Sequence, residues 1–224
     1  IVTAAYGQII STKVLNHPKY KSINVHGSLL PKYRGANPYH RVILNQEKKT
    51  GVTFHLVNEK WDSGEILLQK EVEILETDNG KTLKNKCCNT ARKATFELLK
   101  SLSEEIIIPI KQNENEATYY PSINAKDVLI DFEKDVDKID AQLRALYPWA
   151  SGFFKIKNFY FKITSYKIKD FTHNEKVGKV LKKGFKSLTL ALKNNKIIEF
   201  EKLKGITFLE TFFLPLYIKF FVRK

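Results

Sequence analysis

Asn24, His26 and Asp62 are the residues of this sequence whose types and spacing best fit chemistry. Asn24 and His26 alternate at the end of an apolar run, and Asp62 stands later in the turn Asp62-Ser63-Gly64. Transfer of an acyl group to an amine develops negative charge on the carbonyl oxygen and positive charge on the attacking nitrogen. Such a reaction needs an oxyanion donor and a proton acceptor, which an amide, an imidazole and a carboxylate can supply.

Each of these side chains has a chemical role open to it. Asn24 can donate a hydrogen bond to the oxyanion, and His26, which titrates near neutrality, can polarise the carbonyl or carry the proton. Asp62 can orient the imidazole or relay a proton through water. Plainer interpretations stand beside these, because Asn-x-His alone is a weak pattern and an Asp before Ser-Gly often only forms a turn.

The surrounding chain predicts strands that bring these residues to one edge of a sheet. Ile23 to Val25 read as the end of a buried strand, which Gly27 interrupts. Residues 51–57 and 66–74 alternate or run apolar as two further strands, and Asp62 lies on the loop between them. Open α/β sheets bind their ligands at the carboxyl ends of strands, so the polar side chains are expected there.

Two helices are predicted to support this sheet. Residues 36–45 have Pro38 near the first turn and apolar residues that point inward. Residues 82–102 have apolar residues near helical spacing and Lys on the other face, so we expect them to cover one face of the sheet.

Longer strings carry a resemblance to a known family. INVHGSLLPKYRG (Ile23 to Gly35), followed by DSGEIL, resembles the signature of the tetrahydrofolate-dependent formyltransferases. The match continues through AYGQII, RGANP, GVTFH and RALYPWASGFF in the manner of the members that act on methionyl initiator tRNA. The resemblance implies that a formyl group passes from 10-formyltetrahydrofolate to the amine of methionyl initiator tRNA without a metal. It also implies that Asn24, His26 and Asp62 are the catalytic residues.

The resemblance further implies a folate site. The backbone just after AYG would wall the pterin pocket, and Gly7 would let a flat ring approach. Family members commonly have Pro where Ser11 stands, which is a mild departure. The residues expected to bind 10-formyltetrahydrofolate are Gly7, Gln8, Ile9, Ile10, Ser28, Leu29, Leu30, Pro31, Ser63 and Gly64.

The net charge of +14 belongs to the carboxyl-terminal part of the chain. Residues 1–150 hold 21 Lys and Arg against 19 Asp and Glu, whereas residues 151–224 hold 17 against 5. A basic module beside a near-neutral one suggests a polyanion that is held while something else reacts, and tRNA fits. The competing interpretation is compositional: in an AT-rich genome, Lys is often encoded where any polar residue would do.

The basic part reads as a small β-barrel, because short alternating runs follow Gly152 with Asn, Gly and Lys turns between them. By the resemblance, this is an oligonucleotide-binding-like barrel that contacts tRNA. Arg34, in the YRG turn, lies near the expected mouth of the site but equally fits a loop-stabilising guanidinium. The Lys residues equally fit the solvent face of a barrel. The residues expected to bind tRNA are Arg34, Lys155, Lys157, Lys162 and Lys167.

The predicted fold class is α/β, with part of a doubly wound, Rossmann-like formyltransferase sheet followed by a small oligonucleotide-binding-like β-barrel domain. We expect the carboxyl half of a catalytic domain in residues 1–115, a linker in 116–128 and the tRNA-binding domain in 129–224. The chain contains no Met and opens on an apolar run, as a fragment would. By the resemblance, about 90 residues of the nucleotide fold precede Ile1, so the 224 residues alone are expected not to turn over.

Other features predict little chemistry. Cys87 and Cys88 are adjacent and make no zinc spacing, so no metal site is predicted. The run after Gly205 departs from the family, and Glu210, Pro215 and Lys219 interrupt it too soon for a membrane span. We expect a monomer in the bacterial cytoplasm or an organelle matrix, with no membrane partner.

Two alternatives remain from the sequence. The first keeps the chemistry and changes the acceptor, as in a folate-dependent formyltransferase or hydrolase that acts on a small amine or a sugar nucleotide. The basic second module argues against it, since such enzymes hold no long polyanion. The second alternative is an inactive remnant that binds tRNA or folate.

Overall fold

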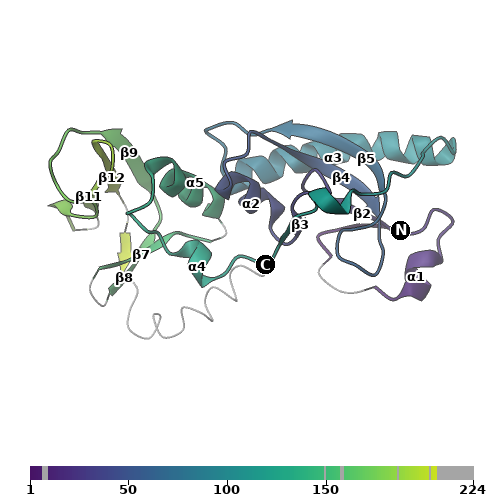
Figure 1. The fold of residues 1–224 in the computed structure, drawn as a ribbon, viewed down its shortest axis with the longest axis horizontal. Helices are drawn as coiled ribbons and strands as arrows, with labels where there is room; N and C mark the ends of the chain where they lie inside the picture. The colour runs from purple at the N-terminus through teal and green to yellow at the C-terminus, as the bar shows by residue number, and fades with distance from the viewer. Residues whose placement is uncertain (7–9, 149, 157–158, 186, 202, 206–224) are drawn as a thin grey trace. The chain divides into compact units, whose positions relative to one another are not determined.

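The computed structural model describes residues 1–6, 10–148, 150–156, 159–185, 187–201 and 203–205. The chain divides into two compact units, Ile1–Ser122 and Ile123–Lys224 (Figure 1). The first unit mixes helices with a sheet, and the second is built mainly from antiparallel strands. The α/β class expected from the sequence, with a second β domain, is therefore confirmed.

The first unit is organised around a four-stranded sheet of order β1-β2-β4-β5. Strands β1 and β2 run parallel, and β2-β4 and β4-β5 are antiparallel. The register places Asn24 opposite both Thr3 on β1 and His55 on β4. The strands are β1 (Val2–Ala4), β2 (Ile23–His26), β4 (Lys49–Leu56) and β5 (Ile66–Glu73).

Among the described residues, three α-helices accompany this sheet, and the longest, α3, packs on β4, β5 and α2. Asn79 begins α3 with a capping box, in which its side chain accepts from the backbone of Lys81 and Thr82. Leu83 and Leu98 are completely buried, and each such side chain stabilises the fold by about 1.5–3 kcal/mol. The helices are α1 (Thr12–Asn16), α2 (Pro38–Leu44) and α3 (Gly80–Ser103).

The segment from Ile110 to Tyr120 belongs to the first unit. Ile110 exchanges two backbone hydrogen bonds with Ile66, at the start of β5. Strand β6 (Tyr119–Tyr120) pairs in parallel with the short strand β3 (Arg34–Gly35), and the 3-10 helix η1 (Glu114–Glu116) lies between these two contacts in the sequence. The segment from Ile110 to Tyr120 thus contacts both the INVHGSLLPKYRG string and the DSGEIL string.

The described residues of the second unit form two antiparallel sheets, of order β10-β11-β12-β9 and β13-β8-β7. Its core includes Phe154 and Phe200, whose rings stack at 5.0 Å between centroids, together with Leu146 from α5. Its helices are α4 (Ala125–Val128) and α5 (Val136–Leu146). Its strands are β7 (Phe153–Ile156), β8 (Phe159–Ile163), β9 (Tyr166–Asp170), β10 (Val180–Lys183), β11 (Leu188–Leu192), β12 (Lys196–Phe200) and β13 (Leu203–Gly205).

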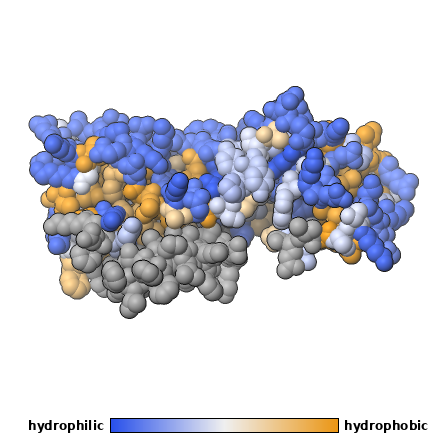
Figure 2. Space-filling model, turned by 60° about the horizontal axis from the view of Figure 1, so that its bottom comes forward, coloured by the Kyte–Doolittle hydropathy of each residue, from blue (hydrophilic) through white to orange (hydrophobic). Residues whose placement is uncertain are grey.

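Hydrophilic residues cover much of the face shown in Figure 2, and apolar side chains reach the surface in patches between them. Within the described ranges, every helix is too short or too polar to cross a bilayer. The run after Gly205, which departs from the family in sequence, lies outside the described residues.

Candidate active site

His26 is the last residue of β2, where the chain leaves the sheet, and only 6% of its surface is exposed. Its Nε2 lies 2.8 Å from the carbonyl oxygen of Tyr33. A carbonyl can only accept, so this nitrogen carries the proton in the neutral ring. The Nδ1 atom faces Oδ2 of Asp62 at 3.6 Å. Burial lowers the pKa of His26, although the Asp62 carboxylate opposes this by raising it. The ring is therefore neutral near neutral pH, with its free lone pair toward Asp62.

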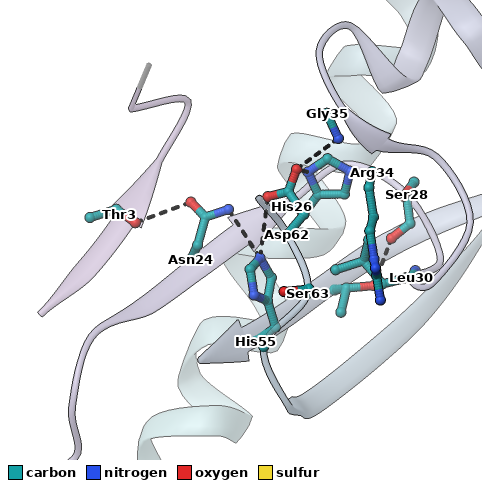
Figure 3. Close-up of polar contacts among 12 residues, drawn as sticks. Thr3, Asn24, His26, Ser28, Leu30, Arg34, Gly35, His55, Asp62 and Ser63 are labelled. Atoms are coloured by element: carbon teal, nitrogen blue, oxygen red, sulfur yellow. Dashed lines mark hydrogen bonds and ion pairs between the residues drawn. The ribbon is translucent and has the colours of Figure 1, made fainter. Parts of the chain in front are cut away.

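Asn24 stands two residues earlier on the same strand and is only partly buried. Its Oδ1 accepts from the hydroxyl of Thr3 at 3.0 Å, and its Nδ2 lies 3.2 Å from Nε2 of His55 (Figure 3). The Nδ1 of His55 faces the carbonyl oxygen of Leu56 at 2.8 Å and must donate to it, which leaves Nε2 as the acceptor. These contacts fix which way the amide of Asn24 points, and one of its N–H groups has no acceptor among the described residues.

Asp62 lies in the WDSG turn between β4 and β5, with φ of +50°. Asp adopts this left-handed conformation more readily than most residues. Its Oδ2 accepts from the backbone N–H of Gly35 at 2.8 Å, and its Oδ1 lies 3.6 Å from Nε2 of His55. Burial raises the pKa of Asp62, but the neighbouring imidazoles of His55 and His26 and the hydrogen bond from the Gly35 N–H outweigh burial and lower it. The carboxylate therefore stays ionised.

The structure thus brings the three predicted catalytic residues together (Figure 3). Asn24 offers an amide donor, His26 a neutral imidazole and Asp62 a carboxylate within 3.6 Å of that imidazole. A carbonyl substrate that meets the free N–H of Asn24 would have its oxygen stabilised as negative charge develops. A proton taken up at Nδ1 of His26 would be stabilised by the Asp62 carboxylate. This chemistry fits acyl transfer.

His55 was missed as a site residue by the sequence analysis. It is 2% exposed and contacts both Asn24 and Asp62, so it joins two of the predicted residues. Its position directly across from Asn24 follows from the pairing of β2 with β4. The string GVTFH was noted for its match to the family, but only the strand register could have shown that its His faces the site.

Arg34 is buried, with 8% of its surface exposed. Its guanidinium donates to Oε1 of Gln112 from Nε and Nη2, at 3.1 and 2.8 Å. It also makes two hydrogen bonds with the carboxylate of Glu114, at 2.9 and 2.7 Å. These contacts favour the loop-stabilising role of Arg34, which was one of its two interpretations. Gln112 was not singled out in the sequence.

The residues predicted to bind folate fall into four groups. Ser28 and Leu30 are buried, and Ser28 donates to the carbonyl of Lys32 at 2.7 Å. Leu29, Pro31 and Ile10 are partly exposed. Ser63 donates to the side chain of Asn58, and Gly64 fits tightly because an added Cβ would lie 1.7 Å from the carbonyl oxygen of Leu56. Gly7, Gln8 and Ile9 lie outside the described residues.

The predicted tRNA-binding lysines lie on the strands of the second unit. Lys155 is on β7 and exposed, with Nζ 5.6 Å from the ring centroid of Tyr160. Lys162 is on β8 and partly exposed, and Lys167 on β9 pairs with Glu201. Lys157 lies outside the described residues.

Ion pairs take up part of the positive charge of the second unit. In residues 151–205, as far as they are described, all four carboxylates pair with a Lys. The pairs are Lys167 with Glu201, Lys169 with Glu199, Lys179 with Glu175 and Lys196 with Asp170. As for metals, the described part of the chain has no group of three His, Cys, Asp or Glu residues arranged to hold an ion.

Comparison with known proteins assigns the family. The family model described as formyl transferase matches residues 1–99, and that of the formyl transferase C-terminal domain matches residues 122–206. The chain belongs to the formyltransferase family. Its relatives include the methionyl-tRNA formyltransferase of Ehrlichia ruminantium (strain Gardel), 42% identical over 82% of this chain and 59% of the relative. That of Enterococcus faecalis is 36% identical over 91% of this chain and 65% of the relative.

The matched part of these formyltransferases is about three fifths of their length.

Solved structures share the fold. The sugar 3N-formyltransferase WlaRD, solved with dTDP and 5-N-formyl-THF, has a TM-score of 0.66 at 23% identity, over 90% of this chain and 71% of that one. HypX from Aquifex aeolicus, in complex with tetrahydrofolic acid, has a TM-score of 0.72 at 15% identity, over 97% of this chain and 38% of that one.

Proposed function

We propose that this chain is part of an enzyme that transfers a formyl group from 10-formyltetrahydrofolate to the amino group of methionyl initiator tRNA. The meeting of Asn24, His26 and Asp62 is the observation that carries the proposal (Figure 3). The named relatives, at 36% and 42% identity, support the choice of acceptor. The role in cells would be the start of protein synthesis.

Asn24 would stabilise the charge that develops on the formyl oxygen. Its amide is held from both sides, by Thr3 at 3.0 Å and by His55 at 3.2 Å, so it need not reorganise during the reaction. Such a preorganised donor contributes about 3–4 kcal/mol to the transition state in comparable sites.

His26 would accept a proton from the attacking amine at Nδ1, because Nε2 is committed to the carbonyl of Tyr33. The lowered pKa of His26 keeps the ring neutral and ready to accept. The carboxylate of Asp62, 3.6 Å from Nδ1, would stabilise the imidazolium that forms. Burial of His26 and Asp62 strengthens this attraction relative to water.

The residues present fit a folate formyl donor, which would supply the carbonyl to be attacked. A single amide donor and a neutral imidazole suit a formyl group, which brings one carbonyl oxygen and no charge. The predicted folate residues Leu29, Pro31 and Ile10 are partly exposed, as a surface that meets a ring would be. Ser28 and Leu30 are buried and would act by shaping the loop.

The second unit would hold the tRNA by its phosphates. Its charge supports this, since residues 151–224 hold 17 Lys and Arg against 5 Asp and Glu. The exposed Lys155 beside Tyr160 is the kind of cation and aromatic pair that a single-stranded end can meet.

The deciding experiment measures labelled formyl transfer by the full-length protein that carries this chain. Methionyl initiator tRNA and a dTDP-amino sugar would be offered as acceptors with 10-formyltetrahydrofolate as the donor. We expect label on the tRNA only, and none with Asn24→Ala or His26→Ala. Transfer to the sugar instead would replace the proposed acceptor, and absence of any transfer while folate and tRNA still bind would show a binding protein.

A further inference from the structure

Gln112 makes four hydrogen bonds around the active site, although the chemistry described above gives it no role. It lies in the segment from Ile110 to Tyr120, more than 45 residues along the chain from the WDSG turn, and is 5% exposed. Its Nε2 donates to the carbonyl oxygens of Asp62 and Gly64, at 2.8 and 2.7 Å. Its Oε1 accepts twice from Arg34, at 3.1 and 2.8 Å.

These partners leave no freedom in how the Gln112 amide is oriented. A guanidinium can only donate and a backbone carbonyl can only accept, so Oε1 must face Arg34 and Nε2 must face the turn. Both N–H groups and both lone pairs of Gln112 are then used. Arg34 is itself held by Glu114 through two hydrogen bonds, so the guanidinium that orients the Gln112 amide is fixed in position.

The turn that Gln112 holds needs such support. Asp62 has a positive φ. This conformation costs a non-glycine residue free energy, so it persists only where the surrounding structure holds the residue in it. On one side the turn packs against β4, where Gly64 leaves no room for a Cβ beside Leu56. Gln112 holds the backbone of the turn on its other side, by donating to the carbonyl oxygen of Asp62 itself.

The same segment also holds the other catalytic loop. The N–H of Tyr33 donates to the Thr118 hydroxyl at 2.8 Å, and the N–H of Arg34 donates to the Thr118 carbonyl at 2.8 Å. The neighbouring N–H, that of Gly35, is left free by this pairing and donates to the Asp62 carboxylate. One segment thus fixes both ends of the Asp62 to Gly35 hydrogen bond.

We propose that Gln112 is a positioning residue of the active site, which holds the Asp62 turn in the conformation that places the carboxylate between Gly35 and His26. It acts through Asp62 and touches no substrate. Its effect on turnover rests on the proposed function, whereas its effect on the Asp62 to Gly35 hydrogen bond does not.

The variant Gln112→Glu tests this in the full-length protein. Glutamate keeps an acceptor for Arg34 but replaces the two N–H donors with an oxygen that repels the turn carbonyls. The exposed Asn115→Asp in the same segment is the control, because it adds the same charge without touching the turn. Asp62→Ala gives the behaviour of Gly35 with no carboxylate to accept from it.

The first readout is residue-resolved amide hydrogen exchange. In Gln112→Glu we expect the Gly35 amide to exchange at least tenfold faster, toward the rate in Asp62→Ala. The amides of Arg34 and Ala36 should stay within twofold, since they donate to the carbonyls of Thr118 and Tyr120. Unchanged exchange at Gly35 overturns the proposal, and so does equal acceleration of all three amides, which would mean that the segment has only a structural role.

The second readout separates turnover from binding. We expect kcat to fall at least tenfold in Gln112→Glu, with KM for both substrates within twofold of the parent and Asn115→Asp unchanged. Should Gln112→Glu fail to fold, Gln112→Asn supplies the same donors on a shorter arm and should show a smaller change of the same kind. A rise in KM at constant kcat would assign Gln112 to binding and would also overturn the proposal. If the parent transfers no formyl group at all, the proposed function fails, and the exchange data still decide the role of Gln112.

Discussion

The carboxylate of Asp62 accepts a hydrogen bond from the backbone N–H of Gly35 at 2.8 Å. This contact joins the WDSG turn to the end of the HGSLLPKYRG loop, so the orientation of the carboxylate depends on two segments that are distant in sequence. It leaves Oδ2 of Asp62 3.6 Å from Nδ1 of His26. The position of the Asp62 charge relative to His26 is therefore set by backbone geometry as well as by the side chains.

Asp62→Asn tests the charge separately from the shape. The Asn side chain can still accept from the Gly35 N–H, so folding should be retained, but it cannot stabilise an imidazolium at His26. We expect the single-turnover rate of formyl transfer to fall about 10²- to 10⁴-fold. The exposed Glu65→Gln in the same loop removes an equal charge and should leave the rate within twofold. A near-normal rate in Asp62→Asn would remove the carboxylate from the mechanism.

The pKa of His26 predicts how activity and stability respond to acid. Burial lowers this pKa below its ordinary value of 6.5, so the unfolded chain binds the proton more readily than the folded chain. The folding stability that depends on His26 is therefore fully present above pH 6.5. It is lost as the pH falls from 6.5 through the lower pKa that His26 has in the folded protein. We expect kcat/KM to fall in the same range, since a protonated His26 cannot accept a proton.

The measurement is a pH profile of kcat/KM beside urea denaturation at each pH. His26→Gln should lack the acid-dependent loss of stability that this group causes, and its residual rate should not vary with pH in that range. An apparent pKa above 6.5 in the parent would contradict the direction given by burial.

Thr3→Val tests whether the orientation of Asn24 matters. The variant removes the hydroxyl that donates to Oδ1 of Asn24 at 3.0 Å and keeps the branched shape. A neutral hydrogen bond contributes about 0.5–1.5 kcal/mol, so we expect kcat to fall about 2- to 10-fold. Thr3→Ser keeps the hydroxyl and should retain most of the rate. Equal rates in the two variants would show that His55 alone orients the amide.

The gathering of Asn24, His26 and Asp62 could be predicted because each stands in a short string that resembles the family signature, beside strands that local patterns mark. Alternation marked a strand at 51–57, close to β4, and helical spacing marked 82–102, where α3 extends by two residues at its start because Asn79 caps it. Local patterns of this kind carry the information that fixes single elements.

The parts that escaped prediction depend on pairing between distant segments. His55 faces Asn24 only because β2 and β4 pair in one register, which nothing within either string specifies. Gln112 and Glu114 lie about 80 residues from Arg34, in a polar stretch whose composition is typical of a linker. The folate and tRNA residues stay predictions, since they concern partners rather than packing.

Arg34→Met separates its two interpretations. The substitution would leave the buried Oε1 of Gln112 without a donor, which costs about 1–3 kcal/mol of folding stability. We expect a lower denaturation midpoint and no change in the salt dependence of tRNA affinity. A reduced salt slope at unchanged stability would instead show that Arg34 contacts a tRNA phosphate.

Lys155 and Lys167 differ in their partners, which predicts different effects on tRNA binding. Lys155 has no carboxylate within ion-pair distance among the described residues, whereas Lys167 pairs with Glu201. We expect Lys155→Ala to reduce the slope of log affinity against log salt by about one, and Lys167→Ala to reduce it less. Glu201→Gln removes the competing charge at Lys167 and should strengthen binding. The measurement is tRNA affinity over a series of salt concentrations, and a flat response in the parent protein would mean that the lysine excess is compositional.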